Sequence, residues 1–117
     1  MREIVIITGG AGFLGSYLCK KLSKTYRVYS IDKNSKNNYN NQNLVGINCD
    51  ITNEAELKKR LQFIKKKNSK IHIINNAAID SVPKNVNFKQ KKNSLLMNQL
   101  AVSFTGTQNI IEFFSNE

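Results

Sequence analysis

A glycine-rich turn between an apolar run and an amphipathic segment is the feature that most limits how this chain can fold. Residues 3–8 read EIVIIT, and residues 8–15 read TGGAGFLG. A short, continuous apolar run is typical of a strand buried on both faces of a parallel sheet. Leucines spaced four apart follow the turn, which predicts a helix. The chain therefore opens with a strand, a glycine turn and a helix.

The glycines of this turn are spaced as GxxGxxG, and each spacing position has a physical role. Gly9 permits a tight turn, Gly12 lets the backbone approach a pyrophosphate with no Cβ in the way, and Gly15 allows close packing of helix on strand. The N-terminus of the helix favours negative charge. We therefore predict a dinucleotide-binding turn rather than a purely structural one, with cofactor-binding residues Gly9, Gly10, Ala11, Gly12, Phe13, Leu14 and Gly15. A P-loop is excluded, because Gly15-Ser16 lacks the required lysine.

Asp32 follows the second predicted strand, residues 27–31, about 20 positions after the glycine turn. Its carboxylate can accept hydrogen bonds from both adenosine ribose hydroxyls, which favours NAD. A 2′-phosphate would face this carboxylate, although Lys33 and Lys36 would offset part of the repulsion, so NADP is the less favoured cofactor. The alternative interpretation of Asp32 is a surface carboxylate at a strand end.

Strands and helices alternate along the rest of the chain. The predicted elements are a helix at 13–23, the strand at 27–31, a polar loop at 33–43, a strand at 44–49, a helix capped by Asn53, a strand at 71–74 and a helix at 94–114. This order predicts an α/β fold, a Rossmann-type doubly wound parallel sheet with strand order 3-2-1-4. We expect residues 1–117 to form only the N-terminal part of that domain.

Helical spacing predicts which side chains face the sheet. The first helix should bury Leu14, Leu18 and Leu22. The second should bury Leu57, Leu61 and Ile64. The last should bury Leu100, Phe104, Thr107, Ile111 and Phe114. His72 alternates with isoleucines in the fourth strand, and we expect a core histidine there.

The formal net charge of +10 raises nucleic acid as a partner. The cations are scattered, however, and the densest group, residues 58–60 and 65–67, lies on and after one amphipathic helix with no interleaved aromatic residues. We interpret it as a solvated face and expect no nucleic-acid partner. No run approaches the ~20 apolar residues of a membrane span. The chain enters an apolar strand directly after Met1-Arg2-Glu3, so we expect no signal peptide and a soluble, cytoplasmic protein. Cys19 and Cys49 have no metal-ligand spacing, and no metal is expected.

Four motifs in order resemble the short-chain dehydrogenase/reductase superfamily: TGGAGFLG, Asp32, Cys49-Asp50-Ile51 and Asn75-Asn76-Ala77-Ala78. The resemblance implies that Asp50 meets the adenine amino group and that Ile51 packs on the adenine ring. It also places Asn75, Asn76, Ala77 and Ala78 beside the nicotinamide ribose, with one asparagine tying the sheet together. The alternative for the asparagine pair is a polar strand terminus. GxxGxxG is the spacing of the extended branch, which includes sugar-nucleotide epimerases and dehydratases, whereas NNAA is similar to the NNAG of the shorter reductases.

The resemblance also implies a catalytic Ser and a Tyr-x-x-x-Lys beyond a fifth strand, and we assign no catalytic residue in this chain. Two pairs match the Tyr-x-x-x-Lys spacing, Tyr17 with Lys21 and Tyr29 with Lys33, and both are rejected. They lie on the phosphate-binding helix and the second strand. Ser103 best matches the position of the family's catalytic asparagine, with Asn98 as a substitute.

The sequence thus predicts the NAD-binding part of an oxidoreductase that moves hydride between the nicotinamide and a carbonyl or hydroxyl carbon of a small-molecule substrate, with a nucleotide sugar or other carbohydrate as the favoured class. The family resemblance suggests a dimer or tetramer. The alternatives are a non-catalytic dinucleotide-binding module, a truncated inactive copy and, ranked below them, a basic nucleic-acid-binding protein.

Overall fold

The computed structural model describes residues 2–35, 39–77, 97 and 99–115. In chain order the elements are β1 (Ile4–Thr8), α1 (Phe13–Leu22), β2 (Arg27–Asp32), β3 (Leu44–Asn48), α2 (Glu54–Lys65), β4 (Ile71–Asn75), a π-helical segment η1 (Ala101–Gly106) and α4 (Thr107–Ser115). Among the described residues, no helix is long and apolar enough to cross a membrane.

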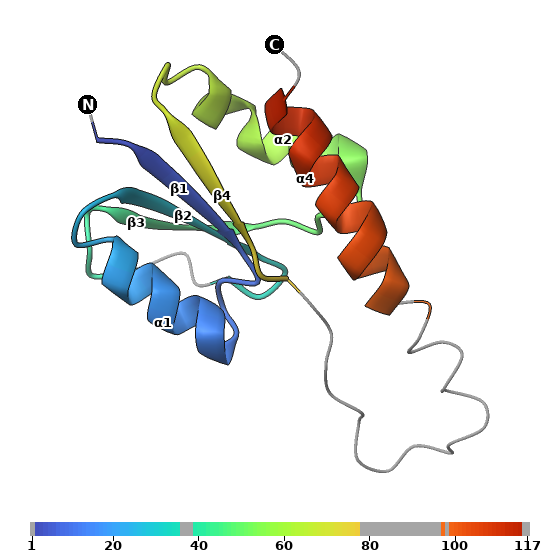
Figure 1. Ribbon diagram of the computed structural model, residues 1–117, viewed down its shortest axis with the longest axis horizontal. Helices are drawn as coiled ribbons and strands as arrows, with labels where there is room; N and C mark the ends of the chain where they lie inside the picture. The colour runs from blue at the N-terminus through green and yellow to red at the C-terminus, as the bar shows by residue number, and fades with distance from the viewer. Residues whose placement is uncertain (1, 36–38, 78–96, 98, 116–117) are drawn as a thin grey trace.

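The four strands form one parallel sheet in the order β3-β2-β1-β4. Figure 1 shows α1 on one face of this sheet and α2 with α4 on the other. The predicted doubly wound fold and its strand order are therefore confirmed. Thr8 lies in register with Ile31 on one side and with Asn75 on the other, so these three strands end together at one edge.

The apolar run of β1 is continuous because both of its faces are covered. Ile4 and Ile6 belong to the core under α2 and α4, whereas Val5 and Ile7 belong to the core under α1. All four side chains are buried. Strands buried on both faces lose the polar alternation of a half-exposed strand, which is the pattern that the sequence shows.

The buried face of α1 differs from the predicted leucine stripe. Gly15 and Cys19 are its buried residues, while Leu14 is exposed. Leu18 and Leu22 pack at the margin of the core as partly buried side chains. Because Gly15 has no side chain, α1 approaches the glycine turn most closely there, and this contact rotates Leu14 toward solvent.

The predicted face of the last helix is also wrong over most of its length. Phe104 is 70% exposed and Ile111 is 51% exposed, and Leu100 is exposed as well. Gly106 and Ile110 are buried instead. A second set of residues with helical spacing, running through Gly106 and Ile110, packs on the sheet, and the sequence pattern alone does not rank the two faces. The predicted start of this helix at residue 94 lies outside the described residues.

His72 is not a core side chain, contrary to the prediction. It is 41% exposed, its Nε2 lies 3.6 Å from Glu3 Oε2, and its ring meets the edge of the Tyr26 ring. The position follows from the topology, because β4 pairs with β1 on one side only in the described sheet.

The two neighbouring isoleucines of α4 test the observed face. Ile110 is 0% exposed, so Ile110→Ala should lower the free energy of unfolding by about 2 to 5 kcal/mol through lost burial and a residual cavity. Ile111→Ala is the matched control and should stay within about 0.5 kcal/mol in urea unfolding at protein concentrations low enough for the chain to be monomeric. The reverse ranking would contradict the observed orientation of the helix.

Candidate dinucleotide-binding site

The glycine turn after β1 is held tightly against both neighbouring strands. Gly9 has φ +69°, a conformation that favours glycine. The Gly9 and Gly10 N–H groups both donate to the Ile31 carbonyl, at 2.8 and 3.4 Å. A Cβ on Gly9 would lie 2.8 Å from the Cα of Ala77. The predicted tight turn at Gly9 is therefore present, and the backbone at Ala77 leaves no room for a side chain at position 9.

Two further glycines are needed for close approach inside the turn. A Cβ at Gly15 would overlap the Gly9 carbonyl oxygen, so α1 packs on the turn itself rather than on the strand. A Cβ at Gly10 would overlap the Ser30 hydroxyl on β2. Gly10 and Gly15 are buried and shape the turn.

Gly12 stands at the N-cap of α1, and its environment differs from that of the other glycines. A Cβ there would meet only the Gly9 carbonyl oxygen, at 3.4 Å, which is ordinary contact. Gly12 provides no side-chain cap for the N–H groups of the first turn. By contrast, α2 is capped by Asn53, whose Oδ1 accepts the Glu56 N–H at 3.1 Å. An uncapped N-terminus with no Cβ in front of it suits a bound anion.

The Asp32 carboxylate is oriented by backbone groups on both sides. The Ala11 N–H donates to Oδ2 at 3.1 Å, and the Asn34 N–H donates to Oδ1 at 2.9 Å. The first of these bonds joins the end of β2 directly to the glycine turn. Each carboxylate oxygen has further acceptor capacity, because an ionised carboxylate offers about four lone-pair sites.

A cavity of about 330 Å³ lies where these segments meet. Six of the predicted site residues line it: Gly9, Asp32, Lys33, Asp50, Ile51 and Ala77. Four residues that the sequence analysis did not name for the site complete the wall: Ile31, Asn34, Cys49 and Val102. The structure thus gathers the ends of β1, β2 and β3, the segment after β4, and η1 around one space, although these lie far apart in the sequence.

Asp50 is held in the cavity wall by two neighbours. Its Oδ1 accepts hydrogen bonds from the Thr52 N–H and hydroxyl, at 3.0 and 2.6 Å, and its Oδ2 lies 3.5 Å from Lys33 Nζ. Burial alone would raise the pKa of the Asp50 carboxyl, but the Thr52 hydrogen bonds and the Lys33 charge outweigh it, so the pKa lies below its ordinary value. Asp50 therefore stays ionised.

Cys49 also lines the cavity, and it is a buried thiol. Burial, with smaller contributions from the charges of Glu56 and Asp50, raises the pKa of this thiol to about 11. Burial likewise raises the pKa of Cys19, on the buried face of α1.

Thr8 is a site residue that the sequence analysis missed. Its hydroxyl donates to Asn75 Oδ1 at 3.2 Å. The same oxygen accepts hydrogen bonds from the backbone N–H groups of Asn76 and Ala77, both at 3.0 Å. The Asn76 side chain donates to the Gly9 carbonyl oxygen at 3.3 Å. The segment after β4 is thereby fixed beside the glycine turn. The sequence feature that could have revealed this role is the hydroxyl residue at the end of an otherwise apolar strand.

Asn75 connects this network to the last helix, because its Nδ2 donates to Thr107 Oγ1 at 2.7 Å. Asn75 therefore links the end of β1 to the last helix. The next residue of the motif, Ala78, lies outside the described residues, as do Lys36 and Asn98.

Several other predicted residues are not brought into the cavity. Phe13 is 98% exposed and Leu14 is exposed, on the first turn of α1. Ser103 is exposed on η1. Tyr17 and Lys21 lie together on α1, with the ammonium 5.7 Å from the ring centroid, and Tyr29 is buried in the core against Phe63. Within the described ranges, no group of His, Cys, Asp and Glu residues could hold a metal ion.

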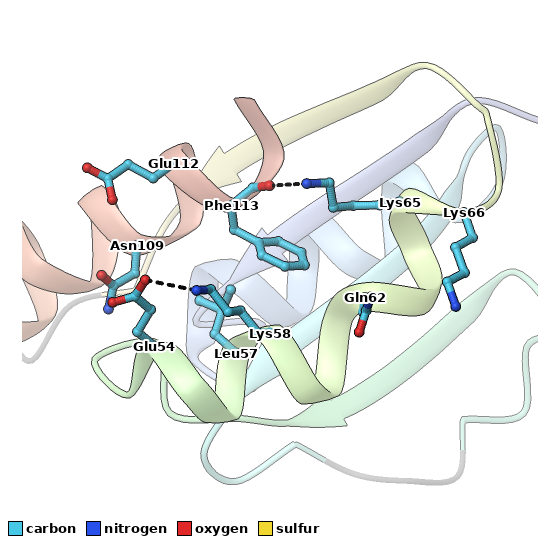
Figure 2. Close-up of a pocket in the computed structure, with 9 residues that line it drawn as sticks. All are labelled: Glu54, Leu57, Lys58, Gln62, Lys65, Lys66, Asn109, Glu112 and Phe113. Carbon is cyan, nitrogen blue, oxygen red and sulfur yellow. Dashed lines mark hydrogen bonds and ion pairs between the residues drawn. The ribbon is translucent and has the colours of Figure 1, made fainter. Parts of the chain in front are cut away.

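A larger cavity, of about 550 Å³, lies between α2 and α4 (Figure 2). Two of its lysines have partners within the lining: Lys58 pairs with Glu54 at 3.3 Å, and Lys65 donates to the Phe113 carbonyl at 2.8 Å with its ammonium 4.8 Å from the Phe113 ring centroid. It lies away from the strand ends and the glycine turn, so the smaller cavity is the candidate site.

A doubly wound parallel sheet with a glycine turn after β1 and a carboxylate after β2 defines a nucleotide-binding protein of the Rossmann class. Residues 5–115 match the model of the NAD dependent epimerase/dehydratase family. The chain therefore belongs to this family, within the short-chain dehydrogenase/reductase superfamily.

Individual relatives include one curated protein and several solved structures. The chain is 32% identical over 119 residues to 3-oxoacyl-(acyl-carrier-protein) reductase FabG of Buchnera aphidicola, covering 94% of this chain and 49% of that protein. A short chain dehydrogenase from Leptospira borgpetersenii with bound NAD+ superposes with a TM-score of 0.79 at 27% identity, over 97% of this chain and 45% of that one. A ligand-free aldohexose dehydrogenase from Thermoplasma acidophilum, 21% identical over 97% of this chain and 43% of that one, shares the fold with a TM-score of 0.77. The chain spans about half the length of the curated relative that it matches.

The lowered pKa of Asp50 predicts a pH dependence of stability. A carboxyl whose pKa is lower in the folded state contributes stability above its unfolded pKa and loses it as pH falls through the folded value. Asp50→Asn should therefore cost about 1 kcal/mol near pH 7, and the difference from the unsubstituted chain should shrink below the ordinary carboxyl pKa of 3.8. Urea unfolding across pH 3 to 7 measures it, with the exposed Glu54→Gln as control. A difference that stayed constant to the lowest pH would contradict the assignment.

Proposed function

We propose that this chain binds NAD in the cavity at the carboxyl end of the sheet and forms the cofactor-binding part of an oxidoreductase. The observation that carries the proposal is the 3.1 Å hydrogen bond from the Ala11 N–H to Asp32 Oδ2. It joins the anion-binding turn and the carboxylate that recognises ribose into one surface. The Leptospira dehydrogenase described with bound NAD+ supports the same assignment.

The residues fit the chemical parts of a dinucleotide one by one. The uncapped first turn of α1 beyond Gly12 would hold the pyrophosphate. Asp32 would accept hydrogen bonds from the adenosine ribose hydroxyls. Asp50 would receive the adenine amino group, and Ile51 would pack on the adenine ring. The nicotinamide half would lie toward Asn76 and Ala77, in the segment after β4 that Thr8 fixes. The nicotinamide, when bound, supplies the hydride acceptor or donor.

Two charges in the cavity support NAD over NADP. Asp32 would lie next to a 2′-phosphate and repel it. Lys33 could offset that repulsion, but its ammonium is 3.5 Å from the Asp50 carboxylate, which already engages the charge. The cation is therefore directed across the cavity toward Asp50.

The reaction that we propose is hydride transfer between the nicotinamide and a carbonyl or hydroxyl carbon. The family match and the extended-type glycine spacing support a carbohydrate substrate, in particular a nucleotide sugar. The described lining of the cavity contains no tyrosine. We propose that residues 1–117 are the dinucleotide-binding part of a larger catalytic unit, and that sequence other than these residues supplies the catalytic Ser and Tyr-Lys pair. The two buried free thiols are consistent with a reducing compartment, and we place the protein in the cytoplasm.

The exposed face of the last helix supports self-association. Met97, Leu100, Phe104 and Ile111 are exposed large apolar residues with spacings of three, four and seven. Residues 97–115 contain a single charged residue, Glu112, in a chain with a net charge of +10. Two copies repel each other least where cations are absent, so we propose a second copy of this chain as the occupant of the face.

The cofactor assignment predicts calorimetric behaviour. The chain should bind NAD more tightly than NADP, and Asp32→Ala should weaken NAD binding by about 10- to 100-fold, because hydrogen bonds to a charged acceptor are lost. The same substitution should reduce the difference between the affinities for NAD and for NADP, because the carboxylate that would repel the 2′-phosphate is gone.

Glu54→Ala is the control for Asp32→Ala, since it removes an exposed carboxylate from α2, outside the candidate site. It should leave NAD affinity unchanged. Failure of the folded chain to bind NAD would refute the proposed function.

The self-association proposal predicts a concentration-dependent dimer in sedimentation velocity. Phe104→Ser should raise the dimer dissociation constant by about tenfold or more, because a large aromatic side chain leaves the interface. Tyr17→Ser, at an exposed aromatic residue on α1 across the sheet, is the control and should leave the dissociation constant unchanged. Monomers at all concentrations would contradict the proposal.

A further inference from the structure

The last helix holds one residue of the cavity wall in two ways. The Asn109 side-chain amide donates to the Ile51 carbonyl oxygen at 2.9 Å. Three residues earlier, Gly106 packs so closely that an added Cβ would lie 2.6 Å from both Cγ1 and Cδ1 of Ile51. Backbone and side chain of Ile51 are thus both fixed by residues that do not line the cavity themselves.

Ile51 needs such support because it belongs to the connection between β3 and α2, outside any strand. A buried loop carbonyl with no partner is costly, and a residue outside the sheet ladder has no strand neighbour to fix its peptide plane. Ile51 is 6% exposed and follows Asp50 directly. The orientation of this connection therefore sets both the apolar surface and the carboxylate that the cavity offers.

We propose that Asn109 and Gly106 are positioning residues for the adenine half of the cofactor: they fix Ile51, and with it the wall on which the base packs. This inference rests on the proposed function, since it assumes that a dinucleotide occupies the cavity. Gly106 is needed because any side chain there would push Ile51 toward the ligand. Asn109 is needed because its amide is the donor that holds the backbone of the loop.

Asn109 is well placed for substitution. It is half-buried and faces the cavity between α2 and α4, beside Glu54 (Figure 2). A changed side chain at this position has open space on one side, so variants should fold. The neighbouring Gln108 is exposed, and its side-chain amide donates to Glu112 at 3.0 Å, which makes it a matched site on the same helix.

The test titrates the 117-residue chain with NAD, AMP and inorganic pyrophosphate. Asn109→Leu keeps the approximate size and removes the donor, and it should weaken NAD and AMP binding by the same factor, about fivefold for one lost hydrogen bond. Pyrophosphate has no base and should bind as before. Asn109→Gln retains an amide donor and should recover part of the affinity for AMP. Gln108→Ala should change none of the three affinities.

Gly106→Ala provides a second, independent variant, because it displaces the Ile51 side chain and leaves the Asn109 amide intact. It should also weaken AMP binding and leave pyrophosphate binding unchanged. Equal losses for AMP and pyrophosphate would show a general effect on folding and overturn the inference. Unchanged AMP binding in both variants would overturn it while the proposed function stands. An unsubstituted chain that binds pyrophosphate but neither NAD nor AMP would refute the proposed function, and with it the inference.

Discussion

The end of β1 is the constraint on which the rest of the site depends. Gly9 turns with positive φ and donates to the Ile31 carbonyl on one side, while the Thr8 hydroxyl binds the segment after β4 on the other. Because β1 is central in the sheet, these contacts hold the two neighbouring strand ends at fixed separations. Asp32 and Ala77 then reach the same cavity. A shift of this one turn would move both halves of the binding surface relative to each other.

Local patterns predicted the parts of the molecule that local physics decides. The glycine turn, the capping of α2 by Asn53 and the doubly wound sheet follow from short-range spacing, and the structure contains them all. The face of the last helix was predicted wrongly, because two apolar faces share helical spacing and the contact of Gly106 with Ile51 selects between them. The role of Thr8 depends on partners more than 60 residues away, which no local pattern encodes.

The close approach between the glycine turn and the segment after β4 explains why residue 9 is glycine. A Cβ on Gly9 would lie 2.8 Å from the Cα of Ala77, a backbone atom that any residue at position 77 would have. The contact therefore restricts the side chain at position 9 and not the one at position 77. Together with the φ of +69°, it makes any substitution of Gly9 unfavourable.

The buried thiol in the cavity wall has a consequence for chemical durability. With a pKa of about 11, Cys49 carries its proton at neutral pH, and the thiolate that oxidants and electrophiles attack is a fraction of about one in ten thousand. The side chain is also 3% exposed. Peroxide or an alkylating agent would therefore react only slowly with this part of the cavity wall at neutral pH.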